Sequence, residues 1–488
     1  MTKGHSRDIL LLILLLAFSL AVMFWVLVRT PLTPNEARSI YMGREVITNG
    51  VLSCSGEAPQ ENNQSIEYLI CAYPGSVAVA PLATATMEKF SGLYGGRSVG
   101  ILFSLALVLL VYLFGNSAFY GGKGLLAATT FVFFGVPLQL SSSAPDAVIA
   151  AFFLSGSLCC IGSAAESQPV LDRAFRLLFA AVLFSIAIMT NYYIAVFAVP
   201  VVLYIISLRQ IQKESVFFFI PLVAILSLYG YVAVLPATPF LVNILQSTLM
   251  QSKTALSAKT SYVLQWLALP YVVSAFGLFH GEKGKIVFMH MLFSSPAFLV
   301  PFVSSEVGAM HAGVLFSLVF LAPAVAIGVE YMGGLLSSYN PASSVRQLFM
   351  AAVLVVIFVF GLQQIKKLSR DYPDLSPAGT FLQEKIGRGT VVVESDYGSP
   401  EYVYRYLLEQ GAPSARIVPI VRGDSQYRSE VITRLSPDFI VLDDYHCDRS
   451  SQRATLEYLA HGFREVKTYQ MTLSSDTKNI RIFQKEVL

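Results

Sequence analysis

Long apolar runs separated by short polar segments occupy the first three quarters of the chain. An apolar run of about 20 residues can cross a membrane as a helix, because each helical residue rises about 1.5 Å. The first run covers residues 9–28, and the pattern predicts about 11 to 13 transmembrane helices. The further predicted spans are Val99–Phe114, Leu125–Leu140, Ala147–Gly162, Leu177–Thr190, Ile194–Leu208, Ser215–Leu235, Tyr262–Phe279, Ile286–Val303, Ala312–Gly328 and Gln347–Gln364.

Residues 29–98 form a polar loop after the first run, and they contain a moderately apolar stretch, Tyr73–Phe90, which favours an interfacial or re-entrant helix. Residues 191–193 predict a tight turn between two spans, because basic residues flank the whole apolar stretch at both ends. The sequence thus predicts a transmembrane domain over residues 1–370, with its first extracytoplasmic loop at 29–98.

From residue 371 the chain has the composition of a soluble domain. Short apolar runs predict strands, and two amphipathic stretches predict helices. The predicted strands are Val391–Val393, Arg416–Ile420, Phe439–Leu442 and Ile480–Phe483, with helices at Pro400–Gln410 and Ser450–Ala460. Alternating strands and helices are typical of an α/β sheet. The fold class predicted is therefore a polytopic α-helical membrane protein with a small C-terminal α/β soluble domain, residues 371–488.

Composition agrees with this division. Hydrophobic residues make up 55% of the chain and charged residues 13%, and the mean hydropathy is +0.60. An average soluble domain has roughly 25% charged residues, so this chain has about half the usual share. The net charge of +3 is too small to indicate a nucleic-acid partner.

The distribution of basic residues predicts an orientation. Lys3 and Arg7 precede the first run, which favours a cytoplasmic N-terminus. With an odd number of spans the C-terminal domain lies outside, although Lys366, Lys367 and Arg370 after the last run favour the opposite side. We expect a multi-pass protein of the cytoplasmic (plasma) membrane, with its active site and C-terminal domain extracytoplasmic.

Asp146 interrupts a charge-free stretch between Lys123 and Glu166, at the start of a predicted span. Ionisable groups at such positions tend to be functional and to face a cavity. A carboxylate that caps the following helix is an equally good interpretation.

A second acid, Glu36, directly follows the first run in a stretch with Asn35, Arg38 and Tyr41. An amide, an acid, a guanidinium and a phenol within two helical turns could bind a sugar and its phosphate. An exposed acid near arginines is more often a solvated ion pair. We expect Glu36 and Asp146 to face one cavity at the membrane surface.

Two further residues begin predicted spans. Arg97 could reach a phosphate at the level of the headgroups, or it could serve as an interfacial anchor. His311 could bind metal or phosphate, although a lone histidine is more often a capping or interfacial residue. The sequence contains no HExxH, CxxC or paired-histidine spacing, so it predicts no metal site, and a divalent ion as cofactor is left open.

The order of these features resembles the membrane-embedded GT-C glycosyltransferases, in particular the family of protein O-mannosyltransferases and lipid A aminoarabinose transferases. The first-loop motif of that family is similar to Pro34–Arg38 with Tyr41. The start of its loop helix is similar to Tyr73–Pro74, and its second-loop aspartate to Ser143–Asp146. Gly96–Ser98 resembles the beginning of the next span.

The resemblance implies an inverting transfer of a sugar from undecaprenyl or dolichyl phosphate to an acceptor hydroxyl on a protein, lipid or glycan, with a carboxylate as general base. Three positions depart from the family pattern. Asn35 stands where the family usually has the aspartate that is taken as its base, and an amide cannot accept a proton. Asn191 and Ala72 stand where the family often has lysines.

Two other functions stay open: a non-catalytic relative that binds glycolipid or scaffolds a complex, and a transporter or flippase for a lipid-linked glycan. A transporter would need charged groups near mid-membrane, and the predicted spans are nearly free of them. The candidate catalytic residues are Glu36 and Asp146. The candidate substrate-binding residues are Asn35, Arg38, Tyr41, Tyr73, Arg97, Asn191 and His311.

Overall fold

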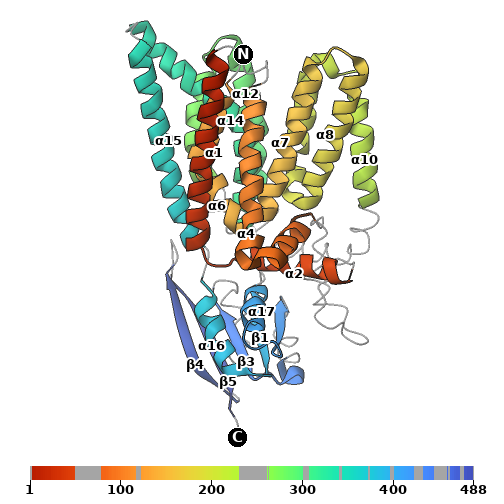
Figure 1. Ribbon diagram of the computed structural model, residues 1–488, viewed down its shortest axis with the longest axis vertical. Helices are drawn as coiled ribbons and strands as arrows, with labels where there is room; N and C mark the ends of the chain where they lie inside the picture. Colours follow the sequence, from red (N-terminus) through yellow and green to blue (C-terminus); the bar gives the residue numbers. More distant parts are fainter. Residues whose placement is uncertain are drawn as a thin grey trace. The chain divides into compact units, whose positions relative to one another are not determined.

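Six helices in the computed structural model are long and apolar enough to cross a membrane (Figure 1). They confirm a multi-pass helical protein, and the count covers only the residues that the structure describes. Their bounds are α1 Lys3–Arg29, α4 Val79–Gly115, α7 Pro145–Glu166, α8 Val170–Thr190, α14 Val307–Tyr339 and α15 Ser343–Asp371. Shorter helices lie at α9 Ala198–Ser207, α10 Val216–Tyr229, Val263–Gly277 and α12 Glu282–Ser294.

The structure describes residues 3–49, 79–116, 123–229, 261, 263–300, 307–339, 343–371, 374–395, 400–421, 432–444, 459, 462–472 and 477–486. Tyr73 lies outside these residues, as does most of the predicted helix Ser450–Ala460. The predicted span Ser215–Leu235 is described as far as Tyr229.

The chain forms two compact units. Among the described residues, the helical unit holds residues 3–27, 79–80 and the segments between 97 and 365. The sheet unit holds residues 28–49, 81–96 and the segments from 366 to 486. The sheet unit therefore includes parts of the first predicted loop in addition to the C-terminal region.

One predicted span is broken in two. Leu125–Leu140 is expected as one helix, but α5 (Gly124–Phe133) and α6 (Val136–Ser143) meet at an angle of 61°. The break occurs at Gly135, whose φ of 77° is accessible mainly to glycine. A Cβ on Gly135 would also lie 2.4 Å from the carbonyl oxygen of Gly361 on α15, so the bend packs directly on a neighbouring backbone.

The predicted turn at residues 191–193 is observed. α8 ends at Thr190, and after Asn191 the 3-10 helix η2 (Tyr192–Phe197) leads into α9. α7, α8 and α10 run side by side in Figure 1, and α7 packs along α8. α14 is the central helix of this unit, since its residues from Ala312 to Val329 are almost all buried.

The sheet unit also contains the whole of α2 and the first part of α4. α2 covers Pro34–Asn49, directly after the first span. The first part of α4 includes residues 79–90, which are the described part of the predicted stretch Tyr73–Phe90. Gly92 interrupts this helix with non-helical angles (φ 67°, ψ −164°).

A five-stranded sheet forms the core of the sheet unit, in the order β2-β1-β3-β5-β4. β1 (Thr390–Ser395) pairs in parallel with β2 (Arg416–Val421) and β3 (Phe439–Asp443). β5 (Thr477–Lys485) pairs antiparallel with β3 and with β4 (Phe463–Thr472). The four predicted strands and the helix α17 (Glu401–Glu409) are observed. The helix α16 (Ser376–Ile386) and β4 are additional.

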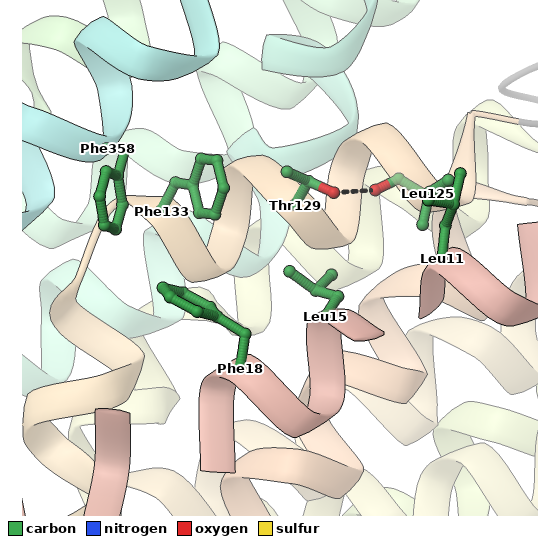
Figure 2. A pocket seen from close by; sticks show the side chains of 7 residues that line it. All are labelled: Leu11, Leu15, Phe18, Leu125, Thr129, Phe133 and Phe358. Atoms are coloured by element: carbon green, nitrogen blue, oxygen red, sulfur yellow. Dashed lines mark hydrogen bonds between the residues drawn. The ribbon is translucent and has the colours of Figure 1, made fainter. Parts of the chain in front are cut away.

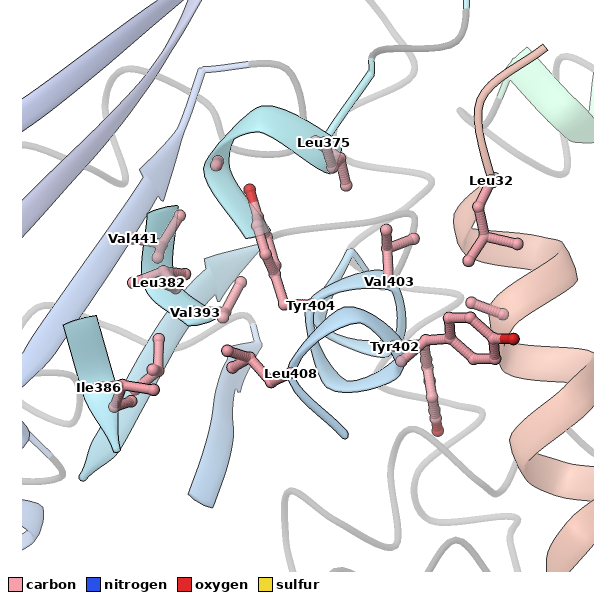
Figure 3. Packing of buried hydrophobic residues seen from close by; sticks show 14 of the residues in the cluster. Leu32, Leu375, Leu382, Ile386, Val393, Tyr402, Val403, Tyr404, Leu408 and Val441 are labelled. Atoms are coloured by element: carbon pink, nitrogen blue, oxygen red, sulfur yellow. The ribbon is translucent and has the colours of Figure 1, made fainter. Parts of the chain in front are cut away.

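Alternate residues of β1 point to opposite faces of the sheet, and both sets are buried. Val391 and Val393 pack against α16 and α17, whereas Val392 faces a smaller cluster with Ile440 and Leu442. Figure 3 shows the larger cluster, in which Leu382 and Val441 lie beside Tyr404. Leu32, just before α2, and Ile40 and Tyr41 on α2 belong to the same cluster. α2 thus shares a hydrophobic core with the C-terminal sheet.

Candidate active site

Asp146 lies in the first turn of α7, directly after the end of α6. Ala144 takes the N-cap position, and Pro145 the first helical position, where its missing N–H costs no hydrogen bond. Asp146 is therefore not the N-cap residue of α7, although its charge lies at the positive end of the helix. Its half-buried side chain comes from a rigid element rather than from a loop.

Asn191 connects Asp146 to the end of α8. Its Nδ2 donates to Oδ2 of Asp146 at 3.3 Å, and its Oδ1 accepts from the backbone N–H of Tyr193 at 3.2 Å. The buried amide is held at both ends, so it fixes the carboxylate with a neutral donor. Tyr192 and Tyr193 follow, with their hydroxyls 2.5 Å apart.

The C-terminal turn of α6 presents a buried polar segment. The hydroxyls of Ser141, Ser142 and Ser143 donate to carbonyls one turn earlier in the same helix, at 2.7 to 3.2 Å. Gln139 is fully buried, and its two side-chain polar atoms make no hydrogen bond with the residues that the structure describes. An unsatisfied buried amide costs about 1–3 kcal/mol. Gln139 therefore has a donor and an acceptor without a partner among the described residues, one turn from Ser143.

Arg97 and His311 belong to the same helical unit as Asp146, and both are buried. Arg97 lies on α4, and His311 lies near the start of α14 with its ring 5.5 Å from that of Trp266. The described residues contain no group of three or more His, Cys, Asp or Glu side chains that could hold a metal ion.

Glu36 has a structural partner in the sheet unit. Its Oε2 accepts from the backbone N–H of Thr33 at 2.8 Å and from the Thr33 hydroxyl at 3.0 Å. The N–H of Glu36 in turn approaches the Thr33 Oγ1 at 3.3 Å. This reciprocal pair is a capping box at the start of α2. Glu36 is 3% exposed, so little of its side chain is accessible to solvent.

Tyr41 packs inside the sheet unit, on the same helix. Its ring is 6.0 Å from that of Tyr402, and the guanidinium groups of Arg44 and Arg405 lie 5.1 and 4.9 Å from its centre. Burial raises the pKa of Tyr41, and the neighbouring Glu409 carboxylate raises it further, so the phenol stays protonated at neutral pH.

Arg44 holds α2 against two other helices of the sheet unit. Its Nη2 pairs with Glu88 at 2.6 Å, its Nε donates to the same carboxylate at 3.3 Å, and its Nη1 pairs with Glu409 at 2.9 Å. Asn35 and Arg38 are half-buried on the same helix. Burial raises the pKa of Tyr402, and the nearby guanidinium of Arg38 lowers it by a smaller amount.

The structure thus brings together Asp146 and Asn191 in the helical unit, which also contains Arg97 and His311. It brings together Glu36, Tyr41 and Arg38 on α2 in the sheet unit. A single cavity that joins the two acids stays a prediction, as do the substrate-binding roles. Tyr73 lies outside the described residues.

Sequence reasoning missed the capping box, Gln139 and the Arg44 network. The capping box could have been predicted from the sequence, since a threonine three residues before a glutamate is its signature. Nothing in the sequence separates Gln139 from its apolar neighbours, and the partners of Arg44 lie 44 and 365 residues away.

No protein-family model matches the sequence, and no curated protein matches it. Solved structures do. The chain is similar to ArnT from Cupriavidus metallidurans bound to undecaprenyl phosphate, at 14% identity and a TM-score of 0.53, over 96% of this chain and 97% of that one.

Two further structures are similar. One is the oligosaccharyltransferase AglB from Archaeoglobus fulgidus with an inhibitory peptide and dolichol-phosphate, at 12% identity and a TM-score of 0.56, over 91% of this chain and 70% of that one. The other is the mycobacterial arabinofuranosyltransferase AftD, at 12% identity and 0.52, over 97% of this chain and 41% of that one. All three are GT-C glycosyltransferases, so the predicted fold class is confirmed.

Proposed function

We propose that this protein is a GT-C glycosyltransferase that moves a sugar from a polyprenyl-phosphate carrier to an acceptor hydroxyl. The observation that carries the proposal is the hydrogen bond between the half-buried Asp146 and the buried Asn191 at the junction of α6, α7 and α8, within a fold shared with ArnT, AglB and AftD. ArnT was solved with undecaprenyl phosphate and AglB with dolichol-phosphate, which supports a lipid-linked sugar as donor.

Asp146 is the general base in this proposal. A base must present a carboxylate oxygen to the acceptor hydroxyl, and Asp146 is half-buried on a helix start with a neutral amide as a partner. Glu36 is the weaker candidate, because its Oε2 accepts two hydrogen bonds from Thr33. We assign to Glu36 the task of shaping α2, which carries Asn35, Arg38 and Tyr41.

The reaction is a single displacement. The acceptor hydroxyl gives its proton to Asp146 while its oxygen bonds to the anomeric carbon. The bond between that carbon and the phosphate oxygen breaks, and the polyprenyl phosphate leaves with the electron pair. Attack opposite to the leaving group inverts the anomeric centre.

The leaving phosphate gains negative charge and needs a positive partner. Arg97 is our candidate, because it is a buried guanidinium in the same unit as Asp146. Asn191, where the resembling family often has lysine, instead orients Asp146. His311 and Gln139 are candidates for contacts with the sugar.

The proposed orientation rests on the basic residues before the first span, which favour a cytoplasmic N-terminus; the acceptor site would then lie outside the cytoplasm. The proposed location is the cytoplasmic (plasma) membrane or an equivalent lumen. The acceptor would be a protein, a lipid or a growing glycan.

The test is transfer by the purified full chain in liposomes. Undecaprenyl-phosphate and dolichyl-phosphate donors that carry a radiolabelled hexose or pentose are supplied together with a membrane extract as the source of acceptors. Label that moves from the lipid fraction into a new product supports the proposal. Tight donor binding without transfer from any donor would instead indicate the non-catalytic relative.

A further inference from the structure

An apolar hollow of about 400 Å³ lies in the helical unit between α1, α5 and α15 (Figure 2). Aliphatic and aromatic side chains line it, and the one hydroxyl among them, on Thr129, donates to the carbonyl of Leu125 in its own helix at 2.8 Å. The hollow therefore offers no hydrogen bond and suits a hydrocarbon chain. Its lining residues are Leu11, Leu15, Phe18, Leu125, Thr129, Phe133 and Phe358.

The hollow runs along α5. Leu125, Thr129 and Phe133 are spaced at one helical turn and lie on one face of that helix. Figure 2 shows Leu11 beside Leu125 at one end and Phe18 with Phe133 and Phe358 at the other. From Leu125 to Phe133 the helix rises about 12 Å.

A glycine of α15 lies against α5 at the Phe133 end of the hollow. A Cβ on Gly361 of α15 would lie 1.8 Å from the carbonyl oxygen of Phe133, so the backbones of α5 and α15 meet there without side chains between them. Two residues that line the hollow, Phe133 and Phe358, lie at or next to this contact, close to the bend between α5 and α6.

Basic residues gather at the opposite end of the same two helices. Lys123 immediately precedes α5, and its Nζ lies 2.6 Å from Oε1 of Glu330 on α14. Arg346, in the first turn of α15, and Lys283 on α12 approach the same carboxylate at 3.7 Å. Among the described residues, three cations therefore surround one acid, and two positive charges remain in excess.

These two features share α5 and α15, and Lys123 precedes Leu125 by two residues. A cationic cluster at the mouth of an apolar groove between spans matches a phospholipid with an anionic headgroup, since basic pockets between transmembrane helices bind such headgroups. The cluster surrounds Glu330, which lies 19 residues along α14 from His311, so it is about 28 Å along that helix from this candidate sugar contact.

We propose that the helical unit has a binding site for an anionic glycerophospholipid. An acyl chain fills the hollow between α1, α5 and α15, and Lys283 and Arg346 hold the phosphodiester while Lys123 stays paired with Glu330. The site is separate from the one that would hold the polyprenyl-phosphate donor. The lipid headgroup binds at the end of the helical unit that carries Lys123, Lys283 and Arg346.

The test is native mass spectrometry of the delipidated full chain, titrated with dioleoyl phosphatidylglycerol or dioleoyl phosphatidylcholine. The double variant Lys283→Gln with Arg346→Gln keeps the close Lys123–Glu330 pair. Each cation near an anionic lipid adds about fivefold to affinity, so the variant should bind phosphatidylglycerol about 25-fold more weakly, with phosphatidylcholine unchanged. The matched control, Arg176→Gln with Arg209→Gln, removes two cations from α8 and from the short 3-10 helix η3 (Arg209–Ile211) and should change affinity less than twofold.

A second variant tests the hollow. Thr129→Trp fills the hollow without a change in charge. The affinity for both lipids should fall at least tenfold, with the far-ultraviolet circular dichroism of the chain unchanged. Equal affinity of the parent chain for the two lipids would overturn the proposal. So would full retention of phosphatidylglycerol by both variants, or displacement of phosphatidylglycerol from the parent chain by an equimolar amount of undecaprenyl phosphate.

Discussion

The capping box at the start of α2 gives a prediction that separates the two acids. Replacing Thr33 by Ala removes the hydroxyl that faces the N–H of Glu36 and leaves this end of α2 without its side-chain cap. Replacing Glu36 by Gln keeps an oxygen for the N–H of Thr33, since glutamine also serves in a capping box. The first change therefore damages the helix start, and the second should preserve it.

The magnitude follows from the contacts. Loss of a threonine N-cap costs about 0.5–2 kcal/mol, with the upper end for buried caps. Thr33 is 1% exposed and Glu36 is 3% exposed, so we expect about 2 kcal/mol for Thr33→Ala. That energy corresponds to an approximately 25-fold increase in the local opening of the first turn of α2.

Hydrogen–deuterium exchange of peptides that cover residues 31–45 measures this opening in the purified full chain. Thr33→Ala should speed exchange about 25-fold at the N–H of Glu36, and Glu36→Gln should speed it less than threefold. The matched control is Thr380→Ala, an exposed position within α16 that should leave the exchange of α2 unchanged.

Turnover supplies the second readout. In our proposal Asp146 is the base and the Glu36 carboxylate accepts hydrogen bonds from Thr33, so Glu36→Gln should retain sugar transfer within about fivefold. A loss of 100-fold or more by Glu36→Gln, with the exchange of α2 unchanged, would refute the structural role and assign the chemistry to Glu36.

Three further predictions concern the framework. Arg44→Lys loses the forked contact with Glu88 and should destabilise the sheet unit by about 1 kcal/mol. The control is Arg388→Lys, at an exposed arginine just after α16, and the purified Arg44→Lys chain should have the lower Tm of the two. Gly135→Ala adds a Cβ 2.4 Å from the Gly361 carbonyl at a φ of 77°, so its yield of folded protein should fall severalfold, whereas Gly334→Ala, with open space, should fold normally. A fragment of residues 374–488 lacks Leu32, which precedes α2, and the α2 side chains Ile40 and Tyr41 of the shared core. It should therefore bind a hydrophobic dye more strongly than a fusion that carries residues 28–49; equal dye binding would contradict that core.

The sequence predicted what depends on local pattern. Runs such as Val99–Phe114 and Ala147–Gly162 are apolar without interruption, and the structure has helices there. The turn after Thr190 followed from basic residues at both flanks, and β1 followed from three consecutive valines. These elements need no knowledge of distant partners.

What the sequence did not predict depends on contacts between distant segments. The bend at Gly135 lies in an apolar run that reads as one span, and its reason is the close approach of α15, more than 200 residues later. The core that α2 shares with the C-terminal sheet likewise joins Tyr41 to Tyr402. Asp146 was identified as a candidate from its position, but its partner Asn191 was selected only by comparison with a lysine in the resembling family.

The measurement that most directly tests the proposed function is the turnover of Asp146→Asn. The variant keeps the size of the side chain and removes the acceptor for the proton, so it should lower kcat by about 100- to 10,000-fold, with the affinity for the lipid-linked donor unchanged. Asp172→Asn is the matched control, because Asp172 is an exposed acid paired with Arg176 at the start of α8. Its kcat should stay within twofold of the parent chain. Transfer by Asp146→Asn at the parental rate would contradict Asp146 as the base.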